Sequence, residues 1–264
     1  MSTSMTTFAV WTSAWLSGNA APDDVLDAMA HWAPMHEVVA DDDGTATVLD
    51  LPADGEPAAT PAALLGALRR GGAESARLVL PVPGDVRGLG GRSAFSAAAL
   101  RHGEAAVFGG AALGVVTEEV AEGILRWTVF DLPEPPRAEH VPIGEAEHGL
   151  TQAVRDAAGA LAELDVARDR PGVREEMAAL LRLATRSPWP DGMPPRALRV
   201  LQRASEVGVM IALAAEDEPG GALSSSAAIR RSEALRPVHD AVRTARSAAV
   251  DEAVRVLSDH AERR

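Results

Sequence analysis

The chain of 264 residues contains no cysteine and no lysine, because all 25 strongly basic residues are arginine. The missing cysteines exclude disulfides, zinc–thiolate sites and thiol nucleophiles. The missing lysines exclude Schiff-base chemistry and the Walker A phosphate loop, which requires a lysine after its last glycine. Several common kinds of enzyme mechanism, those that use a cysteine or a lysine side chain, are therefore excluded for this chain. Whether it is an enzyme stays open, but the sequence favours a non-catalytic role.

Aromatic residues and long apolar runs are also scarce. There are five tryptophans, four phenylalanines and no tyrosine, so the hydrophobic cores must be built mainly from alanine, leucine and valine. No stretch approaches the roughly 18 consecutive apolar residues of a membrane-spanning helix. Residues 1–18 lack the basic start of a secretory signal peptide. We therefore expect a cytoplasmic location and no membrane partner.

Negative charge is abundant, and its distribution along the chain is uneven. The formal net charge is −13. Residues 1–144 hold 19 acidic residues against 8 arginines, whereas residues 145–264 hold 19 against 17. An acidic first half repels nucleic acid and anionic lipid. Nucleic acid is thus the least favoured partner, and it would have to bind the arginine stripes around Arg199 and Arg243, for which a solvated, salt-linked surface is the simpler interpretation.

The pattern of apolar residues changes near the middle of the chain. Short apolar runs alternate with turn signals in the first half, and apolar residues recur at helical spacing in the second. Residues 133–144 contain four prolines, which is typical of a stiff linker. We expect an acidic α+β domain over residues 1–132, a proline-rich linker over 133–144, and an all-helical domain over 145–264 that is suited to assembly.

Composition and periodicity predict a mixed sheet in the first half. The predicted order is a strand over 8–16, a helix beginning at Pro22, an antiparallel hairpin of 36–40 and 45–51, a helix over 62–70 and a strand over 76–82. The hairpin follows from the turn signal Asp-Asp-Asp-Gly at 41–44. This β-α-β-β-α-β order is that of ferredoxin-like folds. Extra strands are expected over 105–108, 113–118 and 124–132.

The stretch that most resembles a binding site follows the strand of residues 76–82. A glycine-rich loop with two arginines leads into a helix that should begin after Ser93. Glycines let a backbone approach a ligand, arginines donate charge-assisted hydrogen bonds, and helix starts favour negative charge. We predict a candidate site for a phosphate or carboxylate ligand, which comprises Gly84, Arg87, Gly88, Gly90, Gly91, Arg92 and Ser93.

The loop matches no established phosphate motif. Ser93 stands where the dinucleotide fingerprint has its third glycine, and no strand with an acidic end follows about 20 residues later. The simpler alternative is a strand-to-helix connection whose arginines pair with nearby carboxylates. No cofactor is predicted.

No other residue pattern identifies a metal or catalytic centre. Glu145 and His148 have the E-x-x-H spacing of di-iron bundles, but a second pair is missing, so we predict a charged, solvated segment and no metal. A G-x-S-x-G nucleophile elbow is absent. The sequence favours a protein that acts by homo-oligomeric assembly or contact with a protein partner. A small-molecule binder or enzyme using residues 84–93 is the alternative, and a nucleic-acid-linked regulator ranks third.

Overall fold

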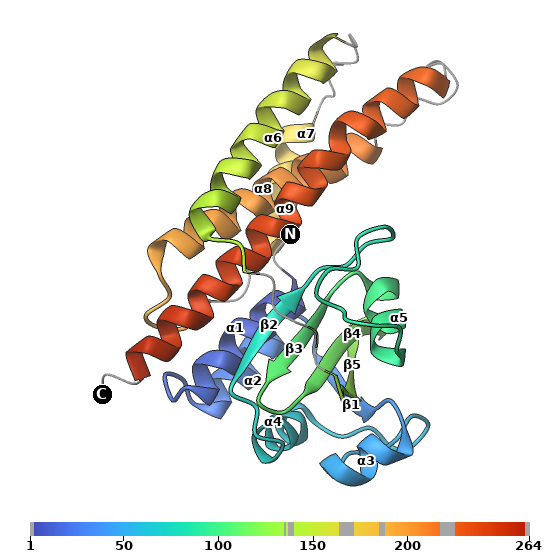
Figure 1. Ribbon diagram of the computed structural model, residues 1–264, viewed down its shortest axis with the longest axis vertical. Helices are drawn as coiled ribbons and strands as arrows, with labels where there is room; N and C mark the ends of the chain where they lie inside the picture. Colours follow the sequence, from blue (N-terminus) through green and yellow to red (C-terminus); the bar gives the residue numbers. More distant parts are fainter. Residues whose placement is uncertain are drawn as a thin grey trace. The chain divides into compact units, whose positions relative to one another are not determined.

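The computed structural model describes residues 3–134, 136, 140–163, 172–184, 188–216 and 225–261 (Figure 1). The described residues form two compact units. The sheet unit is drawn from Thr3–His140, Ser187–Pro194 and Val250–Arg264, and the helical unit from Val141–Arg186 and Pro195–Ala249. The last helix of the chain therefore contributes its first part to the helical unit and its end to the sheet unit.

The sheet unit contains one mixed five-stranded sheet with helices. Its elements in chain order are α1 (Ser4–Leu16), α2 (Pro22–Ala30), β1 (Met35–Ala40), α3 (Asp43–Leu49), α4 (Pro61–Arg70), β2 (Ser75–Val79), α5 (Ala94–His102), β3 (Ala105–Gly109), β4 (Leu113–Ala121) and β5 (Ile124–Asp131). The strand order is β1-β5-β4-β3-β2. Strand β1 runs parallel to β5, and all other neighbours are antiparallel. The predicted α+β class is confirmed.

Helix α1 is buried on nearly every side. All residues from Ser4 to Trp15 are buried, and the ring of Phe8 lies 5.9 Å from that of Phe108 and 4.7 Å from that of Trp127, centroid to centroid. A helix buried all round shows no one-sided apolar stripe. The predicted strand over 8–16 is therefore wrong: its aromatic and β-branched residues pack around a helix, and no helical period distinguishes them in the sequence.

The same helix supplies a hydrogen bond to the edge of the sheet. The Oγ of Ser13 donates to the carbonyl of Ala9 at 2.7 Å and accepts the N–H of Ala76 in β2 at 2.9 Å. Strand β2 is outermost in the sheet, and N–H groups on an edge strand need a partner outside the sheet. Ser13 provides this partner from a buried position.

Helix α3 is the second difference from the predicted fold. Asp42 accepts the N–H of Thr45 through Oδ1 at 2.7 Å and so caps the helix. The first arm of the predicted hairpin is found as β1, but its second arm is helix α3, because the acidic run that resembles a turn signal serves as a helix N-cap. With helices at 4–16 and 43–49, the predicted β-α-β-β-α-β order is not found, and the ferredoxin-like arrangement is not confirmed.

The middle of the first half follows the prediction more closely. Helices α4 and α5 and strands β2 to β5 form where they were expected. Helix α5 packs on the sheet face opposite α1, since Phe95 contacts Phe130 with ring centroids 5.7 Å apart, within a core that includes Val107 and Val116. Gly114 permits this approach, because a Cβ there would lie 2.6 Å from the ring of Phe95.

The helical unit confirms the helices predicted for the second half. It contains α6 (Ile143–Glu163), α7 (Val173–Ala184), α8 (Pro195–Glu216) and the first part of α9 (Ser225–Ala261). Helix α9 continues across Pro237, so the helix is not interrupted at this proline. Of the predicted linker 133–144, residues 135 and 137–139 lie outside the described residues, and the last two residues already belong to α6.

The end of α9 is part of the core of the sheet unit. Leu257 is only 1% exposed, and its carbonyl accepts a hydrogen bond from the side-chain amide of Asn19 at 2.6 Å. The indole N–H of Trp11 in α1 donates to the carbonyl of Pro188 at 2.9 Å. The sheet unit is thus built from three segments that are far apart in the sequence.

Candidate functional site

The arginine at the centre of the predicted glycine-rich loop is already paired. Arg87 donates from Nε and Nη2 to the two carboxylate oxygens of Asp85, at 2.8 and 2.7 Å. The side chain of Arg87 is 57% exposed, so this two-pronged ion pair stabilises the local loop more than the fold. The pairing corresponds to the simpler alternative, in which loop arginines bind neighbouring carboxylates.

The glycines of this loop serve packing as well as turning. Gly84, Gly88 and Gly90 have positive φ angles of 89°, 79° and 73°, which favour glycine. A Cβ on Gly88 would lie 3.0 Å from the guanidinium of Arg77, and one on Gly90 would lie 3.4 Å from the ring of Pro136. Leu89, between them, is buried in the α5 core. Gly91 and Arg92 are exposed.

Ser93 caps α5, as predicted. Its Oγ accepts the N–H of Ser96 at 3.1 Å, and the Oγ of Ser96 accepts the N–H of Ser93 at 2.8 Å. This reciprocal capping box satisfies two backbone donors at the helix start. Fewer donors are then left for an anion, and the binding of a ligand by residues 84–93 stays a prediction.

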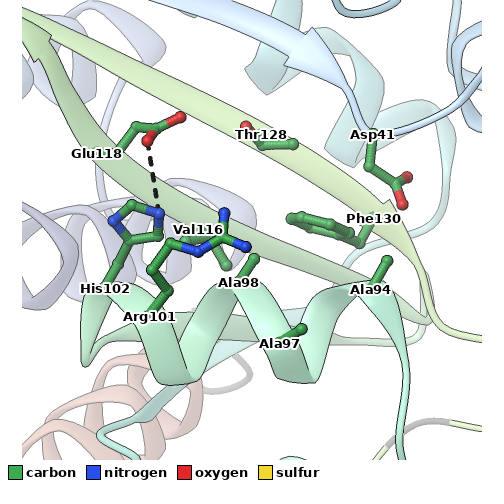
Figure 2. A pocket seen from close by; sticks show the side chains of 10 residues that line it. All are labelled: Asp41, Ala94, Ala97, Ala98, Arg101, His102, Val116, Glu118, Thr128 and Phe130. Carbon is green, nitrogen blue, oxygen red and sulfur yellow. Dashed lines mark ion pairs between the residues drawn. The ribbon is translucent and has the colours of Figure 1, made fainter.

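A cavity lies directly after this loop, between α5 and the sheet (Figure 2). Its volume is about 320 Å³, within the usual size range of small-molecule sites. We call it the α5 groove. It is lined by Asp41, Ala94, Ala97, Ala98, Arg101, His102, Val116, Glu118, Thr128 and Phe130.

The groove results from small side chains on one face of α5. Ala94, Ala97, Ala98 and Arg101 follow the spacing i, i+3, i+4, i+7, so they share one helical face. The three alanines leave space above the sheet, whereas Phe95 on the adjoining face fills the core. Strands β4 and β5 form the floor of the groove. The floor is apolar because it contains the buried side chains of Val116 and Phe130.

The end of the groove beside the last turn of α5 carries the positive charge. The Nε2 of His102 lies 3.5 Å from a carboxylate oxygen of Glu118, and these side chains are 21% and 37% exposed. Within the described part of the chain, Arg101 forms no ion pair. Figure 2 shows its guanidinium extending over the groove towards the ring of Phe130, with the carboxylate of Asp41 beyond that ring.

Asp41 provides the opposite charge at the other end of the groove. It directly follows β1, and its N–H donates to the carbonyl of Val129 in β5 at 3.0 Å. Burial, followed by the repulsion from Asp42, raises the pKa of the Asp41 carboxyl, although a hydrogen bond from Thr45 lowers it in part. Its Oδ1 is buried and has no hydrogen-bond partner among the described residues.

Sequence reasoning placed the candidate site on the loop and missed the groove. The spacing of Ala94, Ala97, Ala98 and Arg101 was a usable signal, since small residues on one helical face leave room for a ligand. Asp41 carried no such signal, because only the parallel pairing of β1 with β5 brings it to Phe130. The groove unites the guanidinium of Arg101, the carboxylates of Asp41 and Glu118 and an apolar floor, which together can bind and orient a small polar molecule.

Two expectations concern the remaining charged residues. Three arginines of the stripes in the second half form ion pairs: Arg196 with Glu147 at 2.9 Å, Arg203 with Glu206 at 3.5 Å and Arg243 with Asp240 at 2.6 Å. For these three arginines, the pairs agree with the salt-linked surface that the sequence favoured.

Glu145 and His148 are exposed on α6. The described residues include no group of three or more metal-binding side chains. None of the helices described combines the length and apolar character that crossing a membrane requires.

Comparison with known proteins identifies a family. The family model for the Rv1486c-like protein, N-terminal domain, matches residues 5–141, and that for the Rv1486c-like protein, C-terminal domain, matches residues 144–247. "Uncharacterized protein Rv1486c" of Mycobacterium tuberculosis (strain ATCC 25618 / H37Rv) is 40% identical over 274 residues. "Uncharacterized protein ML1804" of Mycobacterium leprae (strain TN) is 35% identical over 281 residues. Each alignment covers 92% of this chain and 94% of the relative. No solved structure matches the chain. The chain belongs to the Rv1486c-like protein family.

Proposed function

We propose that the sheet unit binds a small molecule that carries a carboxylate or phosphate group, and that the ligand occupies the α5 groove. The observation that carries this proposal is the position of Arg101, whose guanidinium extends over an apolar floor. Charge-assisted hydrogen bonds from arginine to an oxyanion are among the stronger polar contacts in proteins. The loop of residues 84–93 was predicted to bind the same class of ligand, and its last residue, Ser93, caps the helix that lines the groove.

The environment of Arg101 supports binding of an anion. His102 follows it in the last turn of α5, and its Nε2 lies 3.5 Å from the carboxylate of Glu118. Ala94 and Ala97 on the α5 wall of the groove are exposed, so a ligand that covers them removes apolar surface from water. The groove therefore offers both a charged anchor and apolar contact, the usual composition of a small-molecule site.

The first test is ligand binding to two arginine variants. Calorimetric titration of the wild-type protein with short-chain carboxylates and with inorganic phosphate should reveal binding by at least one of them. Arg101→Ala should weaken that binding about tenfold or more, because a charge-assisted contact is lost. Arg92→Ala is the matched control, since Arg92 is an exposed arginine of the predicted loop.

The two variants also separate the two candidate sites. If Arg92→Ala abolishes binding and Arg101→Ala does not, the ligand binds the loop of residues 84–93 and the proposal for the groove fails. If neither anion class binds to the wild-type protein, an anion-binding function fails for both places.

Homo-oligomeric assembly through the helical unit is a second proposal, favoured by two exposed apolar side chains. Met210 in α8 is 45% exposed and Ile229 in α9 is 58% exposed, and exposed apolar surface is typical of contact sites. Light scattering during gel filtration should show an oligomer that the double substitution Met210→Glu, Ile229→Glu converts to a monomer. Val48→Glu on α3, where Val48 is 82% exposed, is the control. A wild-type monomer at micromolar concentration would refute assembly.

A further inference from the structure

We infer that the ligand of the α5 groove is zwitterionic, with an acidic group at Arg101 and an ammonium group at Asp41 joined by a short aliphatic chain. This inference rests on the proposed function, because it assumes that Arg101 anchors an anion. It adds the second charge of the ligand and therefore its chemical class, the amino acids in the broad sense.

The first observation is the place of Asp41 at the groove. Asp41 is one of the lining residues; its Oδ1 is buried without a hydrogen-bond partner among the described residues, so a ligand in the groove meets the rest of the carboxylate and not this atom. A ligand ammonium group carries three donors together with the charge that complements a carboxylate.

The second observation is the concentration of negative charge around this end of the groove. Asp42 and Asp131 both repel the charged form of Asp41. Arg126 in the neighbouring strand β5 is engaged elsewhere, because it binds Glu37 at 2.9 Å and lies 3.6 Å from Asp54. A cation placed at Asp41 would therefore relieve carboxylate repulsion, whereas a second acidic group would increase it.

The third observation is the surface between the two charges. In Figure 2 the ring of Phe130 separates the guanidinium of Arg101 from the carboxylate of Asp41. Ala94, Ala97 and Ala98 form the opposite wall. Methylene groups are the chemistry that suits such a surface, since they need no hydrogen bonds and gain from contact with apolar atoms.

A chain-length series tests the inference directly. Calorimetry would compare glycine, β-alanine, 4-aminobutyrate, 5-aminovalerate and 6-aminohexanoate with the unsubstituted carboxylates of equal length, and with dicarboxylates. One amino acid of the series should bind about tenfold tighter than its carboxylate, because it adds an ion pair at Asp41. The dicarboxylate of that length should bind more weakly than either.

Two variants assign the two charges. Asp41→Asn should reduce the affinity for the best amino acid to that of its carboxylate while leaving the carboxylate unaffected. Arg101→Ala should weaken both. Asp27→Asn, at an exposed position in α2, is the control for loss of one negative charge, and the melting temperature of each unliganded variant checks that it is folded.

The possible outcomes separate the two proposals. If carboxylates bind through Arg101 but no amino acid binds more tightly, or if Asp27→Asn has the effect of Asp41→Asn, the zwitterion inference is overturned and the anion site stands. If Arg101→Ala changes no affinity, both proposals are overturned.

Discussion

His36 is held as a neutral imidazole by two hydrogen bonds of fixed direction. Its Nδ1 lies 2.9 Å from the indole Nε1 of Trp127, and its Nε2 lies 3.1 Å from the carbonyl oxygen of Met29. An indole N–H can only donate and a carbonyl can only accept, so Nδ1 is unprotonated and Nε2 carries the hydrogen. Burial lowers the pKa of His36, although the backbone contacts with Met29 and Ala33 act in the opposite direction.

This histidine should make the sheet unit sensitive to mild acid. The pKa of His36 is lower in the folded protein than its usual 6.5, so its contribution to stability is complete above pH 6.5 and decreases as the pH falls below that value. His36→Asn keeps an acceptor near Trp127 but cannot be protonated. The melting temperature of this variant should therefore fall less between pH 7 and pH 5 than that of the wild type.

The control for this prediction is His31→Asn, at an exposed position five residues earlier in the chain. It should leave the pH dependence of the wild type unchanged. If the melting temperatures of the wild type and of His36→Asn fall equally between pH 7 and pH 5, protonation of His36 does not destabilise the fold. That result would contradict the role of its two hydrogen bonds.

Asp251 in α9 has the opposite pH dependence. Burial raises its pKa to about 6, although the charges of Arg77 and His140 lower it in part. Its contribution to stability is complete below the usual aspartate value of 3.8 and is lost as the pH rises through 6. The contribution of His36 is lost as the pH falls below 6.5 and that of Asp251 as the pH rises through 6, so their combined contribution to the stability of the sheet unit is smallest at mildly acidic pH.

At the scale of whole elements, α1 contains a pair of adjacent hydroxyl groups with different roles. Ser13 is bonded to Ala9 and Ala76, whereas the Oγ1 of Thr12, also fully buried, has no partner among the described residues. Ser13→Ala should lower the free energy of unfolding by about 1–3 kcal/mol, because it leaves the N–H of Ala76 without a partner. Urea denaturation followed by tryptophan fluorescence measures this change.

Thr12→Val is the matched comparison, since valine has nearly the same shape and the substitution removes a hydroxyl that has no hydrogen-bond partner in the described part of the chain. This variant should be as stable as the wild type or more so. If both substitutions lower the free energy of unfolding by the same amount, the hydrogen bond from Ala76 to Ser13 does not stabilise the edge of β2. The loss then reflects the packing of α1 alone.

The same elements show how far the sequence determines the fold. The strands β2 to β5 were predictable because short apolar runs end at proline, glycine or charged residues, and α4 and α5 because capping and breaking residues flank them. Helix α1 was not predictable from periodicity, since a helix buried on all sides has no polar face. Helix α3 was missed because aspartate favours both turns and helix N-caps.

The candidate site was predictable only in part, for a related reason. Arg101 and the three alanines lie on one helix, so their common face follows from spacing alone. Asp41 lies 60 residues earlier, and its approach to the groove depends on the pairing of β1 with β5 across the sheet. Such a long-range parallel pairing has no local signal in the sequence.

At the scale of the whole molecule, the two units differ in their spectroscopic probes. All five tryptophans belong to the sheet unit, at positions 11, 15, 32, 127 and 189. The long helices α6, α7 and α8 belong to the helical unit. Tryptophan fluorescence therefore follows unfolding of the sheet unit, whereas far-ultraviolet circular dichroism follows helices of both units.

This difference allows a test of the role of α9 in the sheet unit. Leu257 is 1% exposed and lies at the end of α9, more than 230 residues from its partner Asn19. Leu257→Ala should lower the free energy of unfolding measured by tryptophan fluorescence by about 2–5 kcal/mol, because it leaves a cavity in the core. The matched variant is Leu201→Ala, which makes the same change at a 3% exposed residue of α8 in the helical unit.

If the two units unfold separately, Leu201→Ala should shift the circular dichroism transition and leave the tryptophan transition in place. Coincident transitions that both variants shift equally would instead show one cooperative molecule, in which α9 transmits the loss of either core to the whole chain. Leu257→Ala must shift the tryptophan transition in either case, because its side chain is buried in the unit that holds the tryptophans. An unchanged tryptophan transition would contradict the assignment of the end of α9 to the sheet unit.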